Sequence, residues 1–220
     1  MAFYDDLIEA TEVERNTLLS IPFIQSGAAG QLSLESYLAF LGQAYHHVKH
    51  TIPLLMATGG RLPERLEWLR EAIGEYIEEE MGHQEWILND IAACGADKEA
   101  VRHAMPLPAT ELMVAYAYDT VYRNNPVGFF GMVLVLEGTS VSLATHAAEN
   151  IQQALNLPKS AFSYLSSHGS LDVGHVDFYE KLMNRLDREE DQQAVVHCAK
   201  MMYRLYGDIF RSLPVVRLEQ

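Results

Sequence analysis

The chain has few cysteines and few basic residues. Cys94 and Cys198 are the only two cysteines in 220 residues, which is too few for a disulfide framework, and they form no C-x-x-C pair of the kind that binds zinc or does redox chemistry. Only 16 Lys and Arg stand against 30 Asp and Glu, a formal net charge of -14, and this sign opposes attraction to nucleic acid or to an anionic membrane. We therefore expect no nucleic-acid partner and no membrane partner.

We expect no targeting segment, and the sequence shows no convincing internal repeats or linkers. Its N-terminal stretch, MAFYDDLIEATEVER, carries acidic residues where a secretory signal would have a basic region followed by an apolar stretch. The most apolar run, residues 126–148, contains Glu137 and several Gly, Ser and Thr residues, so we interpret it as a buried helix. With 49% hydrophobic and 21% charged residues, the composition is that of a globular protein. We predict one domain over residues 1–220, located in the cytoplasm.

Apolar residues recur at helical spacing along the whole chain, and Gly and Pro separate the periodic segments. The pattern predicts seven or eight helices, several of them longer than about twenty residues. The expected segments are residues 4–25, 34–58, 63–94, 98–104, 110–123, 127–155, 160–186 and 189–213. This organisation predicts an all-α helical bundle, a fold that builds sites from side chains on facing helices.

The most specific motif is HGSLDVGH at residues 168–175. Its His168, Asp172 and His175 stand at i, i+4 and i+7, which places a carboxylate and two imidazoles on one face of a helix. Such a face has the donors and the spacing of a metal site. The alternative is a solvated polar face with two histidines and an incidental acid.

A second pair, Glu80 and His83, stands at i and i+3 in the predicted long helix over 63–94. Carboxylate-bridged di-iron bundles use an E-x-x-H unit to aim one oxygen and one nitrogen ligand inward. Because Glu78, Glu79 and Glu85 lie close by, a solvated acidic face is the alternative interpretation.

Glu137 is the only charged residue between Arg123 and Glu149. An ionised carboxylate in so apolar a helix is costly unless it is paired, hydrogen-bonded, coordinated to a metal or protonated. A metal ligand and a structural acid paired with an arginine or with nearby hydroxyls are both consistent with this position.

Together the three signals supply three histidines and three carboxylates on three helices, a set that suits two metal ions. Nitrogen and oxygen donors without thiolates favour iron or manganese over a structural zinc site, with zinc as an adventitious occupant.

On these residues the sequence resembles the heme-oxygenase-like di-iron oxidases and oxygenases, which share their fold with the thiamin-salvage enzyme TenA and the quinone-cofactor synthase PqqC. Relatives include the chlamydial death-domain-associating protein and the undecene-forming fatty-acid decarboxylase. The family pattern is a Glu and a His on one helix, a Glu on a second, and His-x3-Asp-x2-His on a third. The positions of this chain that match it, in order, are Glu80, His83, Glu137, His168, Asp172 and His175, with Glu79 as a substitute for the first. The segment YHHVKHTIPLL also resembles the second helix of this clan.

The resemblance implies a heme-oxygenase-like bundle and an enzyme in which two irons react with O2 to oxidise a small organic substrate, in a homodimer. Two alternatives stay open. One is a metal-free TenA- or PqqC-like enzyme, a hydrolase or a cofactorless oxidase, although neither cysteine is obviously placed as the nucleophile that the hydrolase would need. The other is a non-catalytic protein that binds a metal or a ligand. His46, His47 and His50 are expected to serve mainly in packing.

Overall fold

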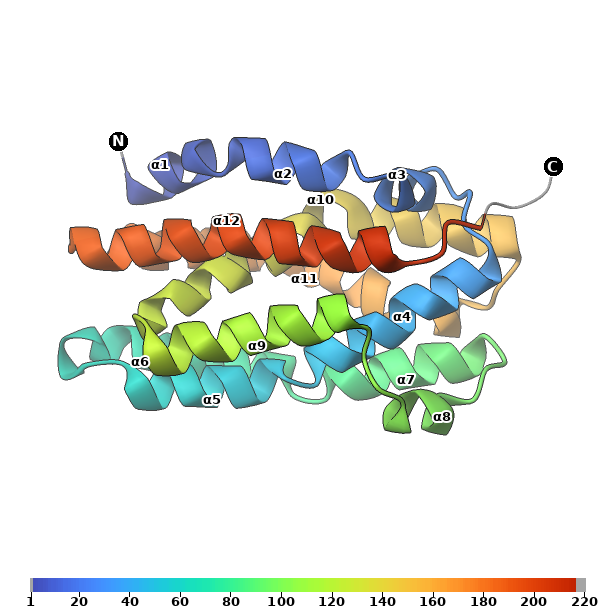
Figure 1. The fold of residues 1–220 in the computed structure, drawn as a ribbon, viewed down its shortest axis with the longest axis horizontal. Coiled ribbons are helices and arrows are strands. Elements are labelled where there is room, and N and C mark those ends of the chain that lie inside the picture. The colour runs from blue at the N-terminus through green and yellow to red at the C-terminus, as the bar shows by residue number, and fades with distance from the viewer. Residues whose placement is uncertain (1, 217–220) are drawn as a thin grey trace.

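The computed structural model describes the backbone of residues 2–216 and the side chains of this stretch, apart from those of residues 140–146 and 167–175. The regular elements of the described backbone are all helices, so the predicted all-α fold is confirmed (Figure 1). The α-helices are α1 (Phe3–Ala10), α2 (Glu12–Leu19), α3 (Pro22–Ala28), α4 (Leu34–Val48), α5 (Thr51–Arg61), α6 (Glu67–Glu80), α7 (His83–Ala93), α8 (Lys98–His103), α9 (Pro108–Arg123), α10 (Phe129–Leu155), α11 (Ser163–Met183) and α12 (Glu189–Ser212). Three short 3-10 helices join them, η1 (Glu64–Leu66), η2 (Pro126–Gly128) and η3 (Lys159–Ala161).

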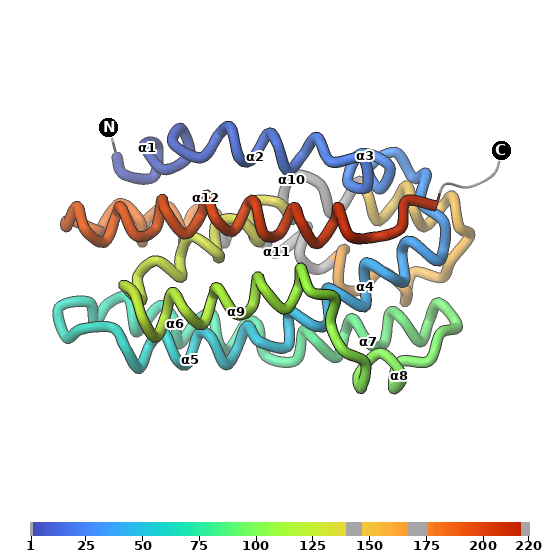
Figure 2. The backbone as a smooth tube through the Cα atoms, viewed as in Figure 1, coloured from blue at the N-terminus to red at the C-terminus, as the bar shows by residue number. Residues whose placement is uncertain are grey.

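The helices form an elongated bundle in which α10 packs on both α11 and α12. Helices α1 and α2 run along one long side of the view, next to α12, and α5, α6 and α7 lie on the other side (Figure 1). The backbone trace shows that α4 runs obliquely between these groups, whereas α9 lies lengthwise between α12 and α5 (Figure 2). No helix among the described residues is both long and apolar enough to cross a membrane.

Three of the predicted long helices are divided in the structure, over residues 4–25, 34–58 and 63–94. Residues 4–25 form three helices instead of one, because the chain bends at Thr11 and again before Pro22, which opens α3 at its first position. The segment after Ser33 is also divided, at Lys49 and His50, between α4 and α5. Gly59 and Gly60, which were expected to end the predicted helix over 34–58, lie within α5, since this helix continues to Arg61.

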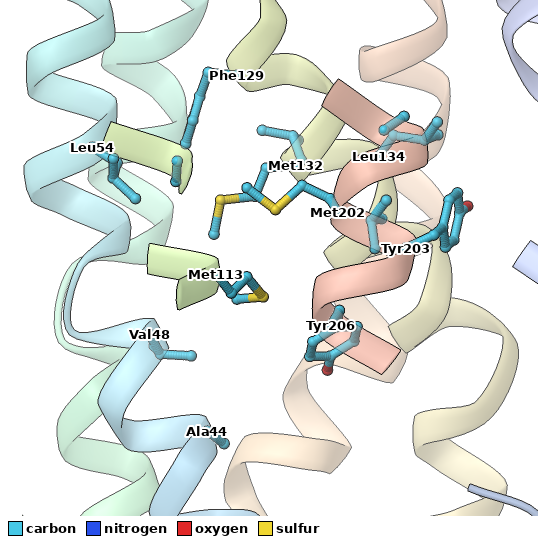
Figure 3. Close-up of a cluster of buried hydrophobic side chains, with 14 of the residues drawn as sticks. Ala44, Val48, Leu54, Met113, Phe129, Met132, Leu134, Met202, Tyr203 and Tyr206 are labelled. Carbon is cyan, nitrogen blue, oxygen red and sulfur yellow. The ribbon is translucent and has the colours of Figure 1, made fainter. Parts of the chain in front are cut away.

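The core between α9, α10 and α12 is rich in methionine. Met113, Met132 and Met202 are almost fully buried, and their side chains meet at the centre of this region (Figure 3). Helices α10 and α12 come close at Gly131, where an added Cβ would lie 2.5 Å from the backbone nitrogen of Ala199. A side chain larger than hydrogen at this position would force the two helices apart.

A buried ion pair ties the start of α12 to two distant turns. Asp191 is fully buried and accepts hydrogen bonds from both terminal nitrogens of Arg65, at 2.6 and 3.1 Å, and from the amide of Asn125 at 2.8 Å. Burial acts to raise the pKa of the Asp191 carboxyl, but these hydrogen bonds and the charge of Arg65 bring it below the ordinary value. The carboxylate is therefore charged and fully bonded at neutral pH, and it fixes the entry to α12.

Candidate metal centre

Glu80 and His83 lie at a break between two helices, so the prediction of one continuous helix over 63–94 is wrong. Glu80 is the last residue of α6 and His83 is the first residue of α7. Between them Met81 is extended, and Gly82 has a φ of +91°, a left-handed conformation that glycine adopts without a steric penalty. The side chains nevertheless meet, since Nδ1 of His83 lies 3.0 Å from Oε2 of Glu80.

The surroundings of this pair favour Glu80 over Glu79 as an inward-facing group. The side chain of Glu80 is 16% exposed and that of His83 is 4% exposed, whereas Glu79 is exposed. The His83 ring packs against the indole of Trp86, with the ring centroids 4.1 Å apart. The packing fixes the orientation of the imidazole beside the Glu80 carboxylate.

Glu80 and Glu137 line the same internal cavity, which we call the polar chamber. Glu137 enters it from α10 and Glu80 from the end of α6. The chamber has a volume of about 60 Å³, and it is further lined by His47, Val48, Thr51, Leu55, Tyr76, Phe129, Met132, Val133, Leu136, Tyr164 and Tyr206. Figure 3 shows four of these residues, Val48, Phe129, Met132 and Tyr206, converging from α4, α10 and α12. Two carboxylates thus face a mostly apolar space, which is a place where oxygen ligands can hold a cation.

Tyr76 adds a phenol to the chamber one helical turn before Glu80. Its side chain is 2% exposed, and its hydroxyl has no hydrogen-bond partner among the described residues. Burial raises the pKa of the Tyr76 phenol far above its usual value, and the charges of Glu137, Glu79 and Glu80 raise it further. The hydroxyl is therefore a protonated donor beside the two carboxylates.

The helix that carries His168, Asp172 and His175 packs against both of the other ligand-bearing regions. Helix α11 contacts α10, which bears Glu137, and α7, which begins at His83. The side chains of these three residues lie outside the described ones. The structure therefore brings Glu80 next to His83 and onto one cavity with Glu137, and the assignment of all six residues as metal ligands stays a prediction.

A buried carboxylate sets the first turn of α11. Asp90 of α7 is fully buried, and it accepts hydrogen bonds from the backbone nitrogens of Ser163 at 3.0 Å and Tyr164 at 2.9 Å, and also from the Ser163 hydroxyl. The first amides of a helix have no partner within the helix, so an acceptor here satisfies them. Asp90 thereby anchors the helix with the HGSLDVGH motif onto α7.

Of the three histidines near the end of α4, His46 and His50 lie outside the lining of the polar chamber. His46 is buried with its ring 3.3 Å from the Lys49 amine, and its pKa falls to about 4 because of burial and the Lys49 charge. Nδ1 of His50 lies 3.1 Å from the hydroxyl of Tyr118. Of the three histidines in this segment, it is His47 that lines the chamber, with its ring edge-on to Tyr206.

Among the side chains that the structure describes, no group of three or more His, Cys, Asp or Glu forms a metal cluster.

Both cysteines lie outside the lining of the polar chamber. Burial raises the pKa of the Cys94 thiol to about 11, with a further contribution from the charge of Asp90. Burial also raises the pKa of the Cys198 thiol, to about 12. Neither thiol is activated as a nucleophile in this environment.

Four lining residues were not identified as site residues from the sequence: His47, Tyr76, Tyr164 and Tyr206. The position of Tyr76 four residues before Glu80 was a usable signal, because residues at i and i+4 share a helix face. The other three come from α4, α11 and α12, and only the fold brings them together.

The fold is that of heme oxygenases and TenA proteins. A domain of unknown function with a heme oxygenase-like fold from Shewanella denitrificans OS217 is 26% identical, with a TM-score of 0.83 over 94% of this chain and 90% of that one. A TenA homologue from Pseudomonas syringae pv. tomato is 12% identical, with a TM-score of 0.81 over 96% and 91% of the two chains. The heme oxygenase from Leptospira interrogans is 19% identical, with a TM-score of 0.77 over 97% and 100%. The predicted heme-oxygenase-like bundle is confirmed.

The family comparison is more specific than the fold. No functionally curated protein matches the chain. A family model described as iron-containing redox enzyme matches residues 38–207, which include all six predicted metal ligands. The chain therefore belongs to this family of iron-containing redox enzymes.

Proposed function

We propose that the protein is a non-heme di-iron enzyme that uses O2 to oxidise a small organic substrate bound in the polar chamber. The observation that carries the proposal is the meeting of Glu80 and Glu137, from helices far apart in the chain, on one buried cavity. Helix α11, with its histidines and aspartate, packs against the two elements that supply Glu137 and His83. Membership of an iron-containing redox family supports the same metal.

The donor set fits iron. Carboxylates and imidazoles without thiolates suit iron or manganese, and Glu80 and Glu137 are both partly buried, so solvent screens a cation between them less than at the surface. The residues that would hold two irons are Glu80, His83, Glu137, His168, Asp172 and His175. Ferrous iron held by these residues would supply electrons for the activation of O2 and for the oxidation of a substrate C–H or N–H bond.

The chain itself would bind and orient the substrate. The apolar walls of the chamber, including Val48, Phe129 and Met132, exclude bulk water from the reacting groups. The Tyr76 hydroxyl, held protonated by burial and by the carboxylates, can donate a hydrogen bond to a substrate oxygen or nitrogen. Tyr76 would thereby orient the substrate next to Glu80 and Glu137.

The metal-free alternative has support from the fold alone. TenA homologues share the architecture, and in an enzyme of that kind Glu137 and Tyr76 would act as general acid–base groups. A TenA-like hydrolase also needs an activated thiol, whereas the pKa values of Cys94 and Cys198 are raised and both lie outside the lining of the chamber. We therefore favour the di-iron enzyme.

The homodimer and the cytoplasmic location stay predictions, and sedimentation would test the homodimer.

The test is anaerobic loading with Fe(II), followed by a count of bound iron per chain and by optical spectra after O2 is added. We expect close to two irons in the wild type and loss of at least one in Glu80→Ala, Glu137→Ala and Asp172→Ala. Glu78→Ala is the matched control, because Glu78 is exposed two residues before Glu80 on the same helix. Full iron retention in all three site variants would contradict the proposal, and a wild type that binds no iron would favour the metal-free reading.

A further inference from the structure

A second cavity lies beside the polar chamber, and its walls are almost entirely apolar. We call it the apolar arm. It has a volume of about 90 Å³ and lies between α3, α4, α10, α11 and α12. Its main lining residues are the aromatic Phe23, Tyr37, Phe40 and Phe210 and the aliphatic Ile24 and Ile151.

Two of the few hydroxyl groups of the arm are already used inside the protein. The hydroxyl of Tyr37 donates to the backbone oxygen of Ala161 at 2.8 Å, and that of Thr139 donates to the backbone oxygen of Val135 at 2.5 Å. A charged or strongly polar ligand group would lose its hydration here and gain little in return. Apolar cavities of this kind bind apolar molecules and tend to stay free of water.

The arm and the polar chamber meet at two side chains. Tyr164 and Tyr206 line both of them. The ring of Tyr206 is edge-on to His47 in the chamber, with centroids 5.8 Å apart, and edge-on to Phe210 in the arm, with centroids 4.8 Å apart. Phe210 in turn contacts Phe40 and Phe23, both at 6.0 Å between centroids. A row of rings therefore leads from the carboxylates into the arm.

We propose that the two cavities form one binding site for an amphipathic substrate, whose polar end reacts beside Glu80 and Glu137 while its apolar tail lies in the arm. This inference rests on the proposed function for the reacting end. The tail site stands on the arm's own composition and on its position against the chamber, with which it shares the side chains of Tyr164 and Tyr206 as walls. The substrate class is thus a small polar head group that carries an alkyl chain, and not a uniformly polar metabolite.

The test uses 1-butanol, 1-hexanol and 1-octanol as neutral probes of the tail site. Binding is measured by calorimetry with the protein before and after loading with Fe(II) under anaerobic conditions. We expect the affinity to rise about fourfold for each added methylene group, or roughly 200-fold from butanol to octanol, because each group leaves water for an apolar wall. Iron should change this series little, since the arm contains none of the predicted ligands.

Two neighbouring alanines provide a matched pair of variants. Ala28 lines the arm, whereas Ala29 is exposed at the end of the same helix. Ala28→Phe should fill the arm and lower the affinity for octanol by about tenfold or more, and Ala29→Phe should leave it unchanged. Ala147→Phe, which enters the arm from α10, is the second filling variant if Ala28→Phe does not fold.

The outcomes separate the tail site from the iron site. No chain-length dependence, or octanol binding that survives both filling variants, would overturn the tail site even if two irons bind. Graded alkanol binding that the filling variants remove, in a protein that binds no iron, would support the tail site and refute the di-iron function. Both results together would support the whole inference.

Discussion

At the scale of single residues, the hydroxyl of Tyr76 is the feature that stability alone does not explain. It is buried without a hydrogen-bond partner among the described residues, and such a group costs roughly 1–3 kcal/mol of desolvation. An uncompensated group of this kind is retained where it meets a ligand, and Tyr76 lies in the wall that holds Glu80 and Glu137. The residue therefore fits a substrate contact better than a packing role.

We predict that Tyr76→Phe leaves the free energy of unfolding unchanged or raises it by up to about 1 kcal/mol, because it removes a buried hydroxyl and keeps the ring. Urea denaturation of the iron-free protein measures this. Tyr179→Phe is the control, since the Tyr179 hydroxyl donates to the backbone oxygen of Phe130 at 2.7 Å and its loss should cost about 1 kcal/mol. A loss as large in Tyr76→Phe as in Tyr179→Phe would mean that the Tyr76 hydroxyl has a bonded partner in the ligand-free protein.

At the scale of elements, the break between α6 and α7 decides how Glu80 meets His83. A continuous helix would carry both residues along one axis, but Met81 is extended and Gly82 has a positive φ, so α7 begins as a separate helix. A Cβ at Gly82 would meet no atom within 4 Å, so only the backbone conformation opposes a side chain there.

We expect Gly82→Ala to lower the free energy of unfolding by about 1–2 kcal/mol, the cost of a left-handed conformation for an L-residue. Gly74→Ala is the matched substitution, because Gly74 lies within α6 with no atom within 4 Å of an added Cβ. It should stabilise the protein by roughly 0.5–1 kcal/mol through its higher helix propensity. Thermal or urea unfolding of the two variants side by side checks the signs, and a stabilising Gly82→Ala would show that the break is not held by the glycine conformation.

Helical periodicity predicted the positions of several helices well, but it did not predict the breaks inside the long segments. The expected segments at 110–123 and 189–213 agree with α9 and α12 to within two residues at each end. The predicted helix over 63–94 is interrupted near its middle. Met81 fits the apolar spacing of that helix, but it lies in the break and is 60% exposed. Periodicity records the faces of helices, whereas a change of direction depends on the conformation of one or two residues such as Gly82.

The candidate site was predictable in its ligand types and less so in its walls. Spacing selected Glu80 and His83, and the isolation of a carboxylate in an apolar helix selected Glu137; in the structure Glu80 and Glu137 line one chamber and His83 contacts Glu80. The chain has 11 tyrosines, and nothing in its local pattern shows that Tyr164 and Tyr206 line a cavity. Their place depends on how α11 and α12 pack, which is a property of contacts between distant segments.

At the scale of the whole molecule, the fold by itself does not decide the chemistry. Heme oxygenases and TenA homologues superimpose on this chain with similar scores, although they are named as different kinds of protein. What distinguishes this chain is the set of side chains grafted onto the bundle. The six proposed ligands come from α6, α7, α10 and α11, so two bound irons would join segments separated by almost one hundred residues of sequence.

Such a site should couple iron binding to the stability of the whole protein. The unfolded chain does not hold these residues together, so Fe(II) binds mainly to the folded state and stabilises it by about 2.7 kcal/mol per site at a free concentration 100 times the dissociation constant. For a protein of this size, each kcal/mol raises the unfolding temperature by roughly 2–4 °C, and we therefore predict an increase of about 5–10 °C per occupied site in anaerobic thermal unfolding. Glu137→Ala should remove most of the increase and Glu78→Ala should keep it, while Mg²⁺ at the same concentration should have little effect because it prefers oxygen ligands and water to imidazole. The contrary outcome is bound iron with an unchanged unfolding temperature. Such iron would have to bind the unfolded chain as tightly as the folded one, and this would rule out a preformed site between the helices.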